Sequence, residues 1–234
     1  MSLNLSQLPL AHRLLIVFAI AAGLAIEVRM DLPGQIALSA VIWLVLFYVL
    51  APIERQERHA LLACLVIATA GELFLSLVWG LYTYRLGNVP LFVPAGHVML
   101  LLLAIALAQQ MSARFACGVL GCAAAYALVA AVTGLDTFAL PLLAMLAVIS
   151  LAMPQHRRLY ASTFLLALAL ELYGTWLGSW TWERHVPAFE LVTTNPPVLA
   201  SAFYAVLDAI VACSALLLAR RFGAPLARSA AREA

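Results

Sequence analysis

The chain has 234 residues, of which 65% are hydrophobic and 10% charged, and its mean hydropathy is +1.03. About a quarter of the residues in a soluble domain are charged, so this composition excludes an ordinary soluble protein and indicates an integral membrane protein. The net charge of +2 comes from arginines in short loops and predicts no nucleic-acid partner.

Apolar stretches recur along the whole chain. Each approaches the length that a helix rising 1.5 Å per residue needs to cross a hydrocarbon core about 30 Å thick. They are residues 14–28, 35–52, 60–82, 91–110, 115–133, 137–153, 159–181 and 196–219. No small-residue cleavage site follows the first stretch, so we expect it to stay as an anchor. The sequence predicts an all-α polytopic membrane protein of about eight spans, with a single transmembrane domain over 1–219.

The arginines predict the orientation, because cytoplasmic loops are enriched in basic residues. With eight spans, ten of the thirteen arginines fall on the side of both termini, and Arg29, Arg85 and Arg184 fall on the other side. This split predicts cytoplasmic termini in a bacterial-type inner membrane, with 220–234 as a cytoplasmic basic tail.

The stretch GELFLSLVWGLYTYR, residues 71–85, has a counterpart in ELYGTWLGSWTWER at 171–184. Glu72 matches Glu171, Ser76 matches Thr175, and each copy is followed by a Val-Pro pair. Both copies begin at an arginine-rich loop, which predicts two parallel four-helix repeats, about 12–112 and 113–219. Chance similarity between apolar helices is the alternative. A duplicated unit would build a site at its own interface.

Three acids lie in these apolar stretches: Glu72, Glu171 and Asp208. Each is about 18 Å along the axis from one end of its predicted helix, which is near mid-membrane. Because a charge there is costly, such acids usually face an internal cavity. Helical spacing places Ser76 beside Glu72 and Thr175 beside Glu171, which predicts one shared polar site.

A buried carboxylic acid that keeps its proton can deliver it as a general acid. If it protonates a carbon–carbon double bond, a carbocation forms, and aromatic faces can stabilise that cation. The aromatic residues predicted to line such a site are Trp79, Tyr82, Tyr84, Trp176, Trp180, Trp182 and Tyr204. Three alternatives stay open: an aromatic belt at the membrane interface, acids that only join helices, and a proton relay in a transporter.

Two further side chains are candidates for the same site. His97, near the start of the fourth stretch, could bond Glu72 or relay protons, or it could simply bond a carbonyl. Arg85 follows the first aromatic motif and could clamp a polar group of the substrate, or it could extend to the membrane surface. No histidine spacing resembles a metal site, so we expect no metal and no cofactor, although acids on different helices could still assemble a metal site.

Both aromatic motifs resemble those of the membrane-embedded carotenoid biosynthesis family that includes carotenoid 1,2-hydratases of the bisanhydrobacterioruberin type. The residues that carry the resemblance are Gly80, Tyr82, Tyr84, Leu86, Gly87, Val89, Pro90, Gly178, Trp180, Trp182, Val186 and Pro187. A weaker similarity, through Glu72 and Asp208, is to small membrane-bound terpene cyclases. Both resemblances imply acid-initiated chemistry on a long apolar isoprenoid.

The sequence therefore favours a membrane enzyme that acts on an isoprenoid or carotenoid-like lipid, by hydration or cyclisation. Glu72, Glu171, Asp208 and His97 are the predicted acid and base residues. The expected partners are this hydrophobic substrate and the membrane lipids, and the oligomeric state stays open. The alternative is a proton-coupled transporter or lipid-binding protein that uses the same acids.

Overall fold

The computed structural model describes residues 8–221, apart from the side chains at 55, 56, 59, 60 and 215–221. Its regular structure is almost entirely helical, and each predicted apolar stretch holds one α-helix. These helices are α1 (Leu10–Glu27), α2 (Leu32–Leu50), α3 (Arg55–Glu72), α4 (Val93–Gln110), α5 (Ala113–Val132), α6 (Ala139–Ala152), α7 (Arg157–Leu177) and α8 (Ser201–Arg221). Of the basic tail predicted at 220–234, residues 222–234 lie outside the described residues.

Length and composition identify five candidate membrane spans in the described part of the chain. They are α1, α2, the segment Leu61–Val78, α4 and α5. The chain bends by 108° between the α6 helix and the segment Pro154–Leu177. These two segments count as a sixth span if they are taken together. The α6 helix has 14 residues and is therefore only about 21 Å long. The protein is thus a multi-pass helical membrane protein with five or six candidate spans.

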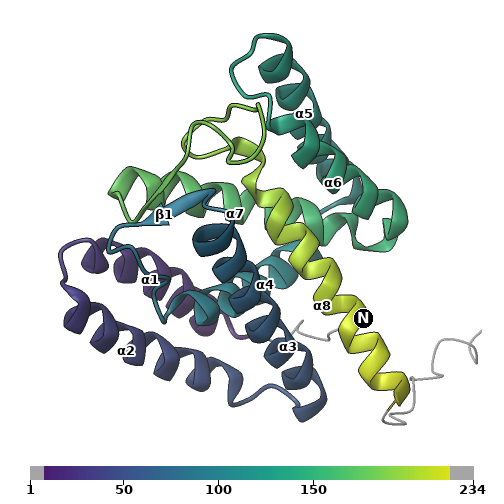
Figure 1. Ribbon diagram of the computed structural model, residues 1–234. Helices are drawn as coiled ribbons and strands as arrows, with labels where there is room; N and C mark the ends of the chain where they lie inside the picture. Colours follow the sequence, from purple (N-terminus) through teal and green to yellow (C-terminus); the bar gives the residue numbers. More distant parts are fainter. Residues whose placement is uncertain (1–7, 222–234) are drawn as a thin grey trace, which may run out of the picture.

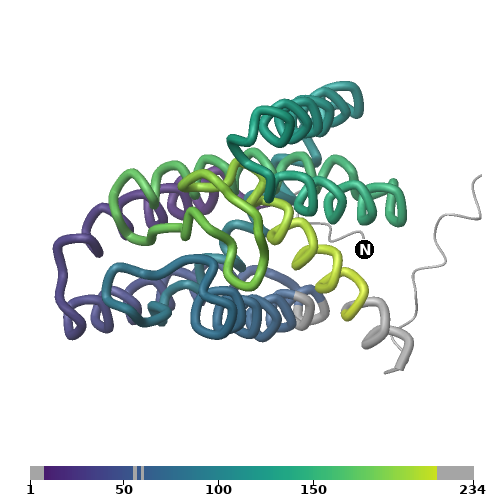
Figure 2. Tube along the Cα trace, turned by 45° about the horizontal axis from the view of Figure 1, so that its top comes forward, coloured from purple at the N-terminus to yellow at the C-terminus, as the bar shows by residue number. Residues whose placement is uncertain are grey.

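Four helices form the core of the molecule. The α3 helix packs against α4, α4 against α7, α7 against α8, and α8 against α3, so that the four make a closed ring. In this ring α3 lies diagonally opposite α7, and α4 lies diagonally opposite α8. The α1–α2 pair packs on one side of the ring, and the α5–α6 pair packs on the opposite side, as Figure 1 and Figure 2 show.

The third predicted stretch, 60–82, is not one continuous α-helix. The α3 helix ends at Glu72 and continues as a π-helix, η2 (Leu73–Val78). The chain then turns at Gly80, which has a φ of +74°, a conformation that residues with a Cβ rarely adopt. A π-helix has more residues per turn than an α-helix, so side chains after Glu72 face other directions than the α-helical spacing predicts.

Two short strands follow the two acid-bearing helices. Strand β1 (Tyr82–Tyr84) pairs antiparallel with β2 (Trp180–Trp182), and the central pair is Thr83 opposite Thr181. The seventh stretch was predicted to be helical to residue 181, but α7 stops before Gly178, whose φ is +80°. In both cases a glycine with positive φ thus lies between the helix and the strand, two residues before the strand begins. The sheet joins segments about 100 residues apart in the sequence.

Candidate active site

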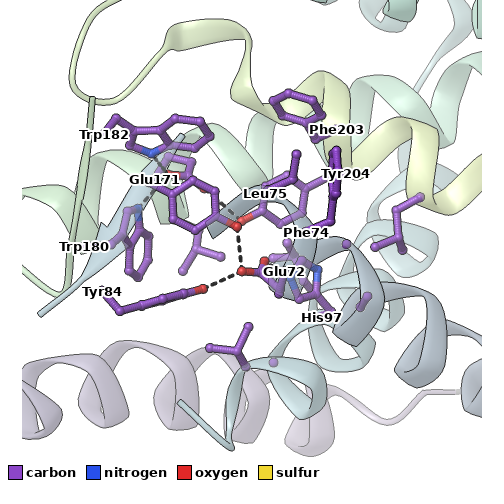
Figure 3. A pocket seen from close by; sticks show the side chains of 18 of the residues that line it. Glu72, Phe74, Leu75, Tyr84, His97, Glu171, Trp180, Trp182, Phe203 and Tyr204 are labelled. Atoms are coloured by element: carbon purple, nitrogen blue, oxygen red, sulfur yellow. Dashed lines mark hydrogen bonds and ion pairs between the residues drawn. The ribbon is translucent and has the colours of Figure 1, made fainter. Parts of the chain in front are cut away.

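Glu72 lies at the end of α3 and is 7% exposed. Its Oε2 atom accepts hydrogen bonds from the hydroxyls of Tyr82, at 2.6 Å, and Tyr84, at 2.7 Å. Its Oε1 atom lies 2.7 Å from Nε2 of His97 on α4. Three aromatic side chains therefore hold this carboxyl group, two from the following strand and one from the next core helix (Figure 3).

Glu171 lies on α7 and is 3% exposed. Its Oε2 atom accepts hydrogen bonds from the indole Nε1 of Trp180, at 2.8 Å, and of Trp182, at 2.9 Å. Its Oε1 atom accepts one from the hydroxyl of Tyr204 on α8, at 2.9 Å. This carboxylate is also held by two side chains of the following strand and one of the next core helix.

The sheet brings the two acids to one place. Alternate residues of a strand point to the same face, so Tyr82 and Tyr84 reach Glu72 together while Thr83 between them is exposed. Trp180 and Trp182 do the same for Glu171. The antiparallel register places Tyr82 against Trp182, with ring centroids 4.6 Å apart and ring planes tilted by 47°.

A second contact links the two acids across the ring of helices. The imidazole of His97 and the phenol ring of Tyr204 are stacked, with centroids 5.0 Å apart and planes 25° apart. His97 contacts Glu72 and Tyr204 contacts Glu171. The two carboxyl groups are therefore joined through a continuous set of aromatic side chains.

The acids face a cavity of about 510 Å³. This volume lies within the range of about 300–1,000 Å³ that is usual for small-molecule pockets. Apart from the two carboxyl groups and their aromatic partners, the lining is apolar, and it includes side chains of α1, α2, α4, α6 and α8. Phe74 and Ile210 belong to this lining and are exposed on the outer surface of the helices. The cavity is therefore open to the outside of the molecule at these side chains.

Most of the aromatic residues predicted for the site line this cavity. They are Trp79, Tyr82, Tyr84, Trp180, Trp182 and Tyr204, and His97 joins them. The indole of Trp79 donates to the carbonyl oxygen of Pro187, which ties η2 to the loop after β2. Trp176 does not reach the cavity. It is 78% exposed on the outside of α7, where it stacks on Tyr173.

The two hydroxyl residues predicted beside the acids lie outside the lining. Ser76 falls within η2, where the wider turn directs Leu75 and Trp79 to the cavity in its place. Thr175 donates to the backbone carbonyl of Glu171, in its own helix. Neither hydroxyl therefore lines the cavity: Ser76 is turned away by the π-helix, and Thr175 bonds back to its own helix one turn from Glu171.

Arg85 and Asp208 also have other neighbours than predicted. Arg85 forms an ion pair with the buried Glu27, at 3.0 Å, and fastens β1 to the end of α1. Asp208 accepts a hydrogen bond from Thr163 of α7, at 2.5 Å, and is not part of the lining. It lies one turn beyond Tyr204 on α8, so the acid is buried in the core but is separate from the two that face the cavity.

Three residues of the site, Gly174, Phe203 and Leu75, were not predicted from the sequence. A Cβ at Gly174 would overlap the ring of Trp180. Glycine destabilises a helix interior, and close approach of another group is one reason to keep it there. Gly174 is therefore a local sequence signal for this contact. Phe203 and Leu75 line the cavity only because of the packing of α8 and the π-helix, which no local pattern indicates.

The charges of the site are mostly negative. His97 is the only basic side chain among the described residues that line the cavity, beside two carboxyl groups. Burial and the neighbouring Glu72 raise the pKa of Tyr84 well above its usual value, so its hydroxyl stays a donor. Within the described ranges, no three His, Cys, Asp or Glu side chains come together as a metal site would need.

Comparisons of the chain with protein-family models, with curated proteins and with solved structures give no match. The function is therefore argued from the geometry of this site.

Proposed function

We propose that the protein is an integral membrane enzyme that protonates a carbon–carbon double bond of an isoprenoid-type lipid. One observation carries the proposal: two buried carboxyl groups face a single apolar cavity, and each is held by three aromatic side chains. The acids supply a proton donor and a base. The electron-rich faces of the aromatic rings stabilise the carbocation between the two steps.

Glu72 is the proton donor in this proposal. Its partners are phenols and an imidazole, which can rearrange their hydrogen bonds when the carboxyl group gains or loses a proton. A proton between Oε1 of Glu72 and Nε2 of His97 can reside on either group. Indole N–H groups only donate, so Oε2 of Glu171 stays an acceptor. Glu171 therefore serves as the base and as the counter-charge of the cation.

The substrate in this proposal is long, apolar and without an anionic head group. A diphosphate would meet two carboxyl groups and a single imidazole, which is an unfavourable balance of charge. Arg85, the nearest candidate for a head-group clamp, is already paired with Glu27. The substrate enters from the bilayer, past the exposed Phe74 and Ile210.

The test is the substitution Glu72→Gln, assayed by mass spectrometry of the lipids that copurify with the protein. Glutamine keeps the size and an acceptor oxygen but cannot act as a general acid, so conversion should fall about 10²- to 10⁴-fold. Trp176→Phe, on the outer surface, is the matched control and should convert lipid normally. Normal conversion by the Glu72→Gln protein would remove the proposal.

A lipid-binding or proton-coupled transport function is the competing proposal. It uses the same buried acids and the same opening to the lipid-facing surface. It predicts that the lipid bound by the wild-type protein has the same covalent structure after incubation, and that flux across vesicles depends on pH. The enzyme proposal predicts a new covalent structure.

The proposal extends to the membrane arrangement: eight spans in two parallel repeats, about 12–112 and 113–219, with cytoplasmic termini in a bacterial-type inner membrane. It is supported by the matching roles of α3 with β1 and α7 with β2, and by the matching pairs α1–α2 and α5–α6. Labelling of single cysteines placed in successive loops tests it. Alternating accessibility supports eight spans, and labelling of the loops at 111 and 153 from opposite sides contradicts them.

A further inference from the structure

We infer that the reaction excludes water and returns an isomer of the substrate, because the proton added by one acid is balanced by a proton removed by the other. This inference rests on the proposed function and decides between ring closure or double-bond migration and hydration. Its basis is the way in which the polar groups of the cavity bind one another.

The N–H and O–H donors of the lining are almost all in use. The hydroxyls of Tyr82 and Tyr84 donate to Glu72, and that of Tyr204 donates to Glu171. The indoles of Trp180 and Trp182 donate to Glu171 as well. Among the described lining side chains, only Nδ1 of His97 has no hydrogen-bond partner.

The acceptors are nearly filled too. A carboxylate offers about four acceptor positions, and three are occupied on Glu72 and three on Glu171. One position on each acid remains, and the reaction itself needs it, to give the proton or to receive it. The indole of Trp79 is bound to the carbonyl of Pro187. Among the described lining side chains, these pairings leave open only one acceptor position on each acid and Nδ1 of His97.

A water molecule would be held poorly in such a cavity. Buried waters typically make about three hydrogen bonds to polar groups that otherwise lack partners. Here the remaining walls are apolar side chains of α1, α2, α3, α4, α6 and α8, and an apolar lipid displaces water from them favourably. A carbocation formed beside Glu72 therefore meets rings and a carboxylate before it meets a nucleophilic oxygen.

The steps balance without any other reactant. A proton leaves Oε1 of Glu72 and bonds to one carbon of the double bond, whose electron pair forms the new C–H bond and leaves a cation. A second double bond of the same lipid molecule attacks the cation and closes a ring, or the cation reacts further without ring closure. Glu171 then removes a proton from a carbon next to the cation, and that C–H electron pair forms a new double bond. The cycle closes when Glu171 releases a proton and Glu72 takes one up.

The experiment uses the full-length protein purified with its own membrane lipids, incubated in deuterium oxide or in heavy-oxygen water. The expected product carries deuterium on carbon, contains no heavy oxygen, and has the mass of its precursor when it is made in ordinary water. Glu72→Gln should lose the deuterium label completely. Glu171→Gln should lose the isomer, since the neutral amide no longer removes the proton.

The outcomes separate this inference from the proposed function. Heavy oxygen in the product, with a mass increased by one water, overturns the inference and leaves the enzyme proposal standing. No deuterium in any lipid of the wild-type protein overturns both. If the Glu72→Gln protein incorporates as much deuterium as the wild type, the assignment of Glu72 as the donor is wrong. Thermal unfolding in detergent verifies that each variant is folded.

Discussion

The sites around Glu72 and Glu171 have the same geometry and different chemistry. Each carboxyl group accepts hydrogen bonds from two aromatic side chains that lie two residues apart on the following strand. Each also has a third aromatic partner on the next core helix. Around Glu72 the strand supplies phenols, and around Glu171 it supplies indoles. A phenol both donates and accepts, whereas an indole only donates. One scaffold therefore holds one acid whose phenol partners can reverse their hydrogen bonds and one whose indole partners only donate.

In the proposed reaction, the two similar sites take opposite roles. The carboxyl groups lie diagonally across the ring of α3, α4, α7 and α8, in the same apolar cavity. The donor types of the two strands, more than their positions, distinguish Glu72 from Glu171.

The largest effects are expected from exchanging the two acids for amides. Glu72→Gln and Glu171→Gln should each lower conversion by about 10²- to 10⁴-fold, because each removes a proton-transfer group. The two variants should differ in whether the first proton transfer still occurs. In deuterium oxide only Glu171→Gln, which keeps the donor Glu72, should still exchange deuterium into unreacted substrate. Mass spectrometry of the recovered substrate measures this exchange. If both variants retain it, or if only Glu72→Gln does, the two roles are assigned wrongly.

Gly174→Ala should disturb the Glu171 site and leave the Glu72 site in place. A Cβ at Gly174 would overlap the Trp180 ring, and overpacking of this kind costs about 1–3 kcal/mol. Thermal unfolding in detergent measures the loss. The matched control is Gly118→Ala on α5, where a Cβ meets nothing within 4 Å and the helix gains about 0.5–1 kcal/mol. Equal stability of the two variants would contradict the close contact.

Tyr82→Phe and Trp182→Phe test the two types of donor at paired positions of the sheet. Each substitution removes one hydrogen bond to a buried carboxyl group, at a cost of about 1–3 kcal/mol. Tyr82→Phe should move the alkaline limb of the pH profile of conversion and Trp182→Phe the acid limb, because losing a donor favours the protonated form of Glu72, the acid, and of Glu171, the base. Activity measured from pH 5 to 9 provides the readout, with this range chosen to cover about two pH units around neutrality. A shift of the same limb in both variants would remove the distinction between the strands.

The smallest effect is expected at Trp176, which was predicted to bind substrate. It is 78% exposed on α7, and surface substitutions usually change stability by less than about 0.5 kcal/mol. Trp176→Phe should therefore leave both conversion and thermal unfolding unchanged. A loss of conversion greater than about tenfold would mean that this indole contacts the substrate, and it would restore the original prediction.

Much of the fold could be predicted because hydrophobic length is a local property of the chain. Each predicted apolar stretch holds a helix, and the pairing of Glu72 with Glu171 followed from matching motifs. The predicted helix ends after both acids were wrong, since glycines with positive φ at 80 and 178 turn the chain from helix into strands that begin at Tyr82 and Trp180. The predicted position of Ser76 was wrong for a different reason: it lies on a π-helix, so α-helical spacing misplaced it.

The sequence by itself determined that the protein is helical, lies in a membrane and buries Glu72 and Glu171, because these properties follow from composition and from costs paid residue by residue. Only the tertiary structure decided which groups hold those acids. The antiparallel register of β1 and β2 and the stacking of His97 on Tyr204 join side chains that are about 100 positions apart. Such contacts depend on how helices and strands pack in three dimensions, so a local pattern of residues does not predict them.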